Sequence, residues 1–197
     1  MTALLCGLLG FALYFLYDIN SITVRSKLLH SSFAIGTAFI ATAKGMDLWS
    51  AFKSNAFSGL TDLLFLVLSA LSFIALIYCL FFALPFQQTY AEQQAANRSV
   101  CGKGVYALCR HPGILCFFGT FLFLGLAAWP ANLLVHGLVF SALNLIYALF
   151  QDRITFPKIF SDYHIYRTRV PFLLPTSNSV RLARDSWPRK DSKEDES

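Results

Sequence analysis

Hydrophobic residues lie in long, nearly unbroken stretches along this chain, and polar residues gather between these stretches and toward the C-terminus. A helix needs about 20 mostly apolar residues to cross the hydrocarbon core of a membrane. Five stretches reach or approach this length: residues 3–17 with a continuation to 24, 28–43, 60–86, 113–129 and 131–150. The pattern therefore predicts an all-α, polytopic membrane protein with about five transmembrane helices.

Proline residues mark two of the predicted helix boundaries. Pro130 stands in the short segment "WPAN" between the last two stretches, where it ends one helix and can start the next. These two stretches are therefore predicted to form an antiparallel helical hairpin, and Pro85 is predicted to end the third helix. The second stretch, 28–43, is the weakest because serine and threonine residues dilute it.

Composition and charge support a membrane location. Only 14% of the residues are charged and 56% are hydrophobic, whereas about a quarter of the residues in a soluble domain are charged. Basic residues fall on one side of the predicted helices, at Arg25, Lys27, 98–110 and the tail, and only Lys44 and Lys53 fall on the other. The positive-inside rule then places the N-terminus outside and the C-terminus in the cytoplasm, as in a multi-pass protein of the cell (inner) membrane.

The same distribution bears on partners and targeting. The chain lacks a basic helix with interleaved aromatic residues, so nucleic acid is not a predicted partner. Its first residues carry no basic segment ahead of the apolar stretch, which predicts a retained first membrane helix rather than a signal peptide. The five cysteines are odd in number and form no Cys-x-x-Cys pair, so neither a disulfide framework nor a metal site is predicted.

The C-terminal region is predicted to divide in two. Apolar and aromatic residues recur at helical spacing at Phe156, Ile159, Phe160, Tyr163 and Tyr166, which indicates an amphipathic helix at the membrane interface. Residues 177–197 are polar and mixed in charge, and we expect a disordered cytoplasmic tail there. The membrane-embedded domain is therefore predicted to comprise residues 1–176.

The last predicted membrane helix carries a polar stripe. At 100° per residue, His136, Phe140, Asn144, Tyr147 and Gln151 fall within about 80° of one another. A polar stripe on a membrane helix turns toward other helices or toward a cavity. Interhelical hydrogen bonding and a ligand site both remain open as its purpose.

Polar chemistry is concentrated beside the helical hairpin, where "CGKGVYALCRHPGILCFFG" sets charge against an apolar helix. Three segments are expected to meet at the cytoplasmic surface: residues 104–112, the pair Gln151–Asp152, and residues 163–170. Arg110 can bind a carboxylate through two parallel hydrogen bonds, and Asp152 can accept from an ammonium or a ribose hydroxyl. This set of groups suits a zwitterionic or multiply polar ligand.

The spacing of these residues resembles that of a known family. The chain has Gly-x-Tyr-x-x-x-Arg-His-Pro at residues 104–112, a polar pair after the hairpin, and Phe-x-x-Tyr-x-x-Tyr-x-x-x-Val-Pro at residues 160–171. In order and spacing this resembles the isoprenylcysteine carboxyl methyltransferases and the related phospholipid N-methyltransferases. The resemblance covers residues 102–176, a little over a third of the chain.

The resemblance implies S-adenosylmethionine-dependent methyl transfer to a lipid-like or prenylated acceptor at the cytoplasmic face of the membrane, with membrane lipids as partners and without a metal. The residues that it places in catalysis are Arg110, Gln151 and Asp152. Those that it places around the cofactor are Tyr106, Arg110, His111, Pro112, Gly113, Asp152, Tyr163 and Tyr166.

Two positions depart from the family pattern. The family has an acidic residue where this chain has Gln151, and often a tyrosine after the His-Pro step, where this chain has Gly113. Two other functions therefore stay open, namely an NADPH-dependent membrane reductase of the steroid-reductase type and a non-catalytic lipid-binding relative. Cofactor binding distinguishes the three, and the identity of the acceptor is left open.

Overall fold

The computed structural model of this protein describes residues 1–54, 56–57, 59–83, 99–129 and 132–187. Every regular element in these ranges is a helix, which confirms the predicted all-α class. The chain forms two compact units: unit 1 comprises Met1–Leu76 and Gly113–Ile159, and unit 2 comprises Ile77–Pro112 and Phe160–Ser197.

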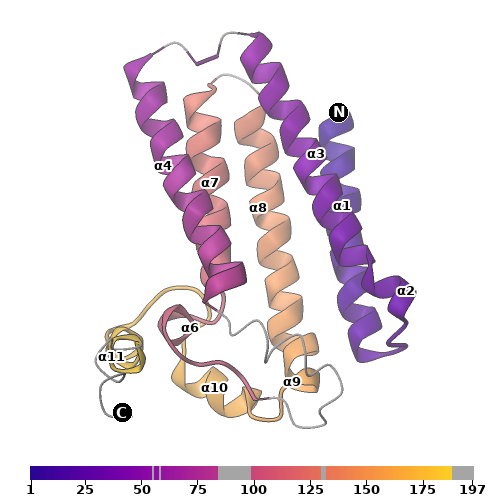
Figure 1. The fold of residues 1–197 in the computed structure, drawn as a ribbon, viewed down its shortest axis with the longest axis vertical. Coiled ribbons are helices and arrows are strands. Elements are labelled where there is room, and N and C mark those ends of the chain that lie inside the picture. The colour runs from indigo at the N-terminus through magenta and orange to yellow at the C-terminus, as the bar shows by residue number, and fades with distance from the viewer. Residues whose placement is uncertain (55, 58, 84–98, 130–131, 188–197) are drawn as a thin grey trace, which may run out of the picture. The chain divides into compact units, whose positions relative to one another are not determined.

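Unit 1 is built from long helices that run alongside one another (Figure 1). In chain order its elements are α1 (Thr2–Ile22), α2 (Lys27–His30), α3 (Ser32–Lys53), α4 (Leu60–Ile77), α7 (Pro112–Ala127), α8 (Leu133–Phe150), the π-helical turn η2 (Gln151–Thr155) and α9 (Phe156–Ile159). The last residue of α4 and the first of α7 belong to unit 2.

Three helical stretches among the described residues are long and apolar enough to cross a membrane: Thr2–Ile22, Leu60–Phe82 and Leu133–Ile159. They coincide with the first, third and fifth predicted stretches and confirm that each is an apolar helix of spanning length. At 1.5 Å per residue the 16 residues of α7 span about 24 Å, less than the roughly 30 Å of a hydrocarbon core. Helix α3 has 22 residues but a more polar composition. The total of five membrane helices therefore stays a prediction.

Small residues let the helices of unit 1 approach closely. A Cβ atom added to Gly7 of α1 would overlap the ring of Phe140 on α8. Where α1 crosses α3, a Cβ on Gly10 would come within 2.8 Å of the Gly36 carbonyl oxygen. The core that these contacts enclose includes Phe11, Ile40, Ala43 and Phe140. Close backbone approach at small residues is the usual way in which membrane helices gain packing energy.

Helices α7 and α8 pack as the sequence predicted for a hairpin. A Cβ on Gly125 would lie 2.5 Å from the Cα of Leu134, so the two backbones are close near the turn. Pro130 and the predicted boundary at Pro85 lie outside the described residues. On its other side α7 contacts α4, where the Ser69 hydroxyl donates to the Thr120 carbonyl at 2.8 Å.

The second predicted membrane helix differs from the sequence interpretation. It was expected to cover 28–43 and to place Lys44 in an outer loop, whereas α3 begins at Ser32 and continues to Lys53. Lys44 and Asp47 are both buried inside the helix packing of unit 1. The prediction was wrong because the two charged side chains interrupt the apolar pattern of the sequence. Their burial is possible because Asp47 pairs with both Lys44 and His136.

Unit 2 contains the turn η1 (Tyr78–Phe82) and the helices α6 (Val105–Leu108), α10 (Tyr163–Arg169) and α11 (Ser177–Ser186). The amphipathic helix predicted over 156–166 is interrupted, because α9 ends at Ile159 and α10 begins at Tyr163. The carboxylate of Asp162 accepts a hydrogen bond from the backbone N–H of Val100 at 2.9 Å, which holds the interruption in place. As a result Tyr163 is buried rather than presented to an interface.

The prediction of a disordered tail from residue 177 is wrong for residues 177–186, which form α11. The helix begins with a capping box, in which the Thr176 hydroxyl accepts from the Ser179 N–H at 3.3 Å and the Ser179 hydroxyl accepts from the Thr176 N–H at 2.8 Å. Ser179 and Ala183 are buried, and α11 packs against α6. The sequence did not indicate this helix because its composition is polar, and its composition is polar because only one narrow face packs against other residues.

Glycine is required where α6 meets α11. Gly104 has a φ of 58°, which an L-residue with a side chain rarely adopts. Its N–H donates to the Ser186 hydroxyl at 3.2 Å. The first residue of the Gly-x-Tyr-x-x-x-Arg-His-Pro pattern therefore serves to turn the backbone onto α11.

Removing residues 177–197 is expected to destabilise unit 2, because the truncation deletes α11 and the hydroxyl that accepts from Gly104. Limited proteolysis of purified protein in detergent should then cut the 99–112 segment at least several times faster than in the full chain. The matched control ends at Trp187 and keeps all of these contacts, so it should be cut at the rate of the full chain. Equal rates for the two truncations and the full chain would contradict the assignment of α11 to the folded unit.

Candidate functional site

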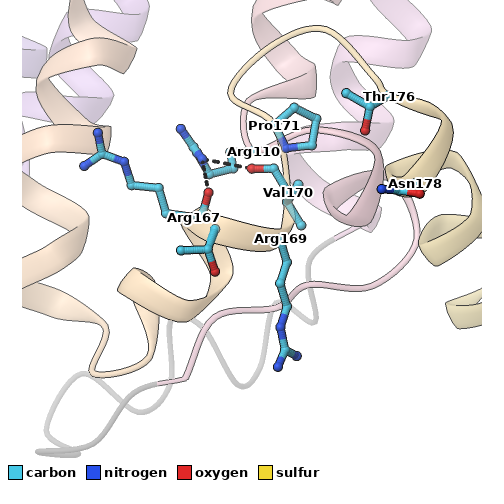
Figure 2. A pocket seen from close by; sticks show the side chains of 8 residues that line it. Arg110, Arg167, Arg169, Val170, Pro171, Thr176 and Asn178 are labelled. Carbon is cyan, nitrogen blue, oxygen red and sulfur yellow. Dashed lines mark hydrogen bonds between the residues drawn. The ribbon is translucent and has the colours of Figure 1, made fainter.

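Arg110 joins two segments of unit 2 that are far apart in the sequence. Its Nη1 atom donates to the carbonyl oxygens of Arg167 and Val170, each at 2.9 Å (Figure 2). These carbonyls lie at the C-terminal end of α10, where backbone oxygens lack helical partners and the helix dipole favours a cation. The guanidinium also lies over the ring of Phe172, 5.7 Å from its centroid.

The backbone of the Arg-His-Pro segment is hydrogen-bonded to the residues that follow α10. The N–H of Arg110 donates to the Pro171 carbonyl at 2.9 Å, and the N–H of His111 donates to the Phe172 carbonyl at 3.3 Å. The imidazole of His111 packs on the Phe172 ring with centroids 5.0 Å apart. The Arg-His pair is therefore held against residues 171–172 by both backbone and side-chain contacts.

Three tyrosines of the predicted site support this arrangement. The Tyr166 hydroxyl donates to the Tyr106 carbonyl at 2.6 Å, and the Tyr106 hydroxyl donates to the Cys79 carbonyl at 3.0 Å. Tyr163 is buried and packs on Tyr166 with ring centroids 5.9 Å apart. Burial, and then the neighbouring Tyr106, raise the pKa of the Tyr166 phenol, so it remains a neutral donor at physiological pH.

A pocket of about 270 Å³ lies beside Arg110 in unit 2. Its lining residues are Arg110, Arg167, Thr168, Arg169, Val170, Pro171, Thr176 and Asn178. Figure 2 shows the side chains of Arg167 and Arg169 extending away from each other, and both residues are exposed. Arg110 is thus the cation that the surrounding backbone holds in one position, and the other two guanidinium groups lie at the rim.

The chemistry of this pocket is that of an anion site. A guanidinium presents five N–H donors in a planar fork that matches a carboxylate or a phosphate. Thr176 and Asn178 add groups that donate and accept hydrogen bonds at the same wall. The volume is sufficient for the polar end of a cofactor and is below the usual size of a pocket that holds a whole nucleoside-containing ligand.

The predicted site residues are divided between the two units. Unit 2 contains Tyr106, Arg110, His111, Pro112, Tyr163 and Tyr166. Unit 1 contains Gly113, Gln151 and Asp152. Pro112 is the first residue of α7, the helical position at which proline loses no hydrogen bond. Sequence reasoning placed residues 163–170, which include Arg167 and Arg169, at the site, but it missed Thr176 and Asn178. The meeting of the two sets stays a prediction.

Gln151 and Asp152 open the π-helical turn η2, and Asp152 is buried. The carboxylate of Asp18, on α1, faces the side chain of Gln151 and accepts a hydrogen bond from the Thr155 hydroxyl at 3.4 Å. Asp18 was not among the predicted site residues. Asp18 stands near the end of an apolar stretch, where a residue of an exposed loop would also stand. The sequence pattern therefore did not indicate that this carboxylate is buried.

A second buried polar cluster in unit 1 involves the stripe on α8. His136 Nδ1 donates to Asp47 Oδ1 at 2.8 Å, and Lys44 Nζ lies 3.4 Å from Asp47 Oδ2. The Lys44 ammonium also lies over the rings of Phe121 and Phe140, 4.6 and 4.4 Å from their centroids. For His136, the hypothesis that the polar stripe of the last predicted membrane helix makes interhelical hydrogen bonds is therefore confirmed. The i, i+3 spacing of Lys44 and Asp47 in the sequence indicates that these two side chains can pair on one face of a helix.

The helical fold, and the three apolar helices of spanning length among the described residues, are typical of a helical membrane protein. Comparison with protein-family models, with curated proteins and with solved structures gives no match.

Proposed function

We propose that this protein transfers a methyl group from S-adenosylmethionine to a lipid-like or prenylated acceptor at the cytoplasmic face of a membrane. The observation that carries the proposal is the anion pocket formed by Arg110, the end of α10 and Thr176. Arg110 belongs to the Gly-x-Tyr-x-x-x-Arg-His-Pro segment, whose spacing resembles that of membrane methyltransferases. A guanidinium held by two carbonyls suits the carboxylate of the methionine portion.

In this proposal each residue has a separate task. Arg110 binds the carboxylate, while Tyr106, Tyr163 and Tyr166 hold the segment that carries it. Asn178 accepts from the ammonium group of the donor. S-adenosylmethionine supplies an activated methyl group when it is bound. Alignment of acceptor and methyl group and exclusion of water are the main contributions that a protein makes to such a transfer.

The roles of the remaining predicted residues belong to the same proposal. His111 and Pro112 fix the start of α7, and Gly113 leaves its first turn without a side chain. By the family resemblance, Asp152 and Gln151 are the residues of unit 1 proposed for catalysis. The proposal includes the predicted topology of five membrane helices with the N-terminus outside, in which these residues are expected at the cytoplasmic face.

A second candidate function is recognition of a phosphate group, as in an anionic lipid headgroup. The presence of three arginines around one pocket favours it, because a phosphate carries more charge and more acceptor oxygens than a carboxylate. The 2′-phosphate of NADPH would use the same chemistry. Binding measurements with the three ligands therefore decide between methyl transfer, reduction and lipid binding.

Purified protein in detergent is expected to bind S-adenosylmethionine in a calorimetric titration, and Arg110→Lys is expected to weaken binding by about tenfold or more. Lysine keeps the charge but loses the planar fork. Arg181→Lys is the matched control, since Arg181 is exposed on α11 and does not line the pocket. The control should bind as the wild type does.

The outcomes of this titration are distinct. Equal affinity of wild type and Arg110→Lys would show that Arg110 only anchors the backbone. Binding of NADPH or of an anionic lipid, without binding of S-adenosylmethionine, would replace the methyltransferase proposal by the matching alternative. Transfer of a labelled methyl group into membrane lipids or prenyl-thiol analogues then tests the acceptor class.

A further inference from the structure

Two tryptophans are exposed at the same end of unit 1. Trp49, near the end of α3, is 61% exposed, and Trp129, just after α7, is 65% exposed. Their neighbours Ala51 and Ala128 are fully buried in one cluster, which joins the end of α3 to the turn between α7 and α8. Figure 1 shows these two helix ends together, beside the starts of α4 and α8. The two indoles therefore lie near one level of the helix bundle.

A second aromatic ring and a cation lie beside Trp49. The ring of Phe52 is exposed and lies nearly parallel to the indole, with ring centroids 6.4 Å apart and an angle of 21° between the planes. The Lys53 ammonium lies over the same indole, 5.2 Å from its centroid. Among the described residues this ammonium forms no ion pair. Its charge is therefore available to an anion outside the chain.

The exposed side chains of unit 1 change in character at the level of the two indoles. On the side of the helices, large exposed apolar side chains belong to Met46, Leu48, Leu63, Leu64 and Val67. On the other side, exposed polar residues include Ser50, Lys53, Ser54 and Asn132. Tryptophan has an apolar ring system and one N–H donor, and it is enriched where hydrocarbon meets the headgroups of a membrane. This arrangement is typical of a contact with the interfacial layer of a bilayer.

We infer that this end of unit 1 binds the interfacial layer of a phospholipid bilayer through Trp49, Phe52, Lys53 and Trp129. The three aromatic rings lie among the glycerol and carbonyl groups of the lipids, where the indole N–H groups donate to lipid oxygens. The Lys53 ammonium binds the lipid phosphates. This contact lies entirely in unit 1 and does not depend on the methyl-transfer proposal.

The contact sets the depth of the buried charges of α3. At 1.5 Å per residue, Asp47 lies about 3 Å and Lys44 about 8 Å from Trp49 along the helix, on the hydrocarbon side. A charged side chain costs less near the interface than at the centre of a bilayer. The inference therefore gives a physical reason why α3 can carry Lys44 and Asp47 inside the helix packing.

The test measures the depth of each indole in the full chain, reconstituted into phosphatidylcholine vesicles. Phenylalanine replaces two of the three tryptophans at a time, so that Trp49 or Trp129 is the single indole fluorophore. Lipids brominated near the headgroup should quench each of them at least about twofold more than lipids brominated near the end of the acyl chain. Leu71→Trp, in a chain without other tryptophans, is the matched control. Leu71 is exposed near the middle of the apolar stretch Leu60–Phe82, so the deep bromines should quench there more strongly.

The role of the cation is tested in the protein whose single tryptophan is Trp49. Lys53→Glu should raise the quenching of this indole by acrylamide in the water phase at least about twofold, because lipid phosphates repel the new carboxylate. Lys27→Glu alters an exposed lysine of α2 and should leave the quenching unchanged. Equal effects of the two substitutions, or no effect of Lys53→Glu, would contradict the contact between Lys53 and phosphate.

The depth measurement itself has outcomes that overturn the inference. One is stronger quenching of either indole by the deep bromines than by the shallow ones. Another is quenching by acrylamide without quenching by either lipid, which would place this end of unit 1 in water. A clear difference in depth between Trp49 and Trp129 would also contradict a common interfacial level. Since both rings are exposed, their replacement by phenylalanine leaves no cavity that would prevent folding.

Discussion

Replacement of Asp47 by alanine is expected to lower the free energy of unfolding by about 3–5 kcal/mol. The substitution removes the one carboxylate that holds both His136, at 2.8 Å, and Lys44, at 3.4 Å. Lys44 is 9% exposed, so its ammonium would be left buried, and its remaining partners among the described residues would be the faces of two phenylalanine rings. The loss follows from the uncompensated charge and not from the strength of the original pair.

Chemical unfolding of the purified protein in detergent measures this effect. The informative comparison is the double variant Lys44→Met, Asp47→Leu, which removes both charges and keeps apolar volume. Because buried ion pairs often contribute little beyond the cost of desolvating them, the double variant should lose less stability than Asp47→Ala alone. A double variant that is the less stable of the two would contradict the reasoning, and so would a loss below about 1 kcal/mol for Asp47→Ala.

Gly7→Ala is expected to destabilise the protein by about 3 kcal/mol or to prevent folding, because overpacking of a closed core forces side chains and backbone to shift. The added Cβ atom would overlap the ring of Phe140, which is fully buried between α1 and α8. Gly45→Ala on α3 is the matched control. Apart from its chain neighbours and the backbone of α3 itself, no heavy atom of the described residues lies within 4 Å of a Cβ built there, so alanine should be neutral or slightly stabilising in that helix.

A compensating change identifies the contact. Phe140→Ala alone should destabilise by creating a cavity, but the combination with Gly7→Ala should lose less stability than the sum of the two single variants. The same chemical denaturation experiment provides all four values. Additive losses, or equal effects of Gly7→Ala and Gly45→Ala, would show that α1 and α8 are not packed at this point.

Much of the candidate site could be named from the sequence, though not its contacts. The spacing from Gly104 to Pro112 identified Arg110, His111 and Tyr106, and the spacing from Phe160 to Pro171 identified Tyr163 and Tyr166. The hydrogen-bond partners of Arg110 could not be predicted, because its side chain binds backbone carbonyls. Every residue has such a carbonyl, so the sequence does not indicate which ones are bound. The pocket residues Thr176 and Asn178 were missed for a related reason, since they stand where a polar composition resembles a disordered tail.

The sequence by itself determined the all-α class and the positions of three apolar helices, because burial in lipid depends on composition summed over some 20 residues. Only the tertiary structure decided which polar side chains are buried. The buried cluster joins Lys44 and Asp47 of α3, which interrupt the apolar pattern, to His136 of α8. Asp18 and Thr155, which are also in contact, are 137 residues apart in the sequence. Burial of a charge depends on whether a partner is present in space, and a one-dimensional pattern does not record which residues become neighbours.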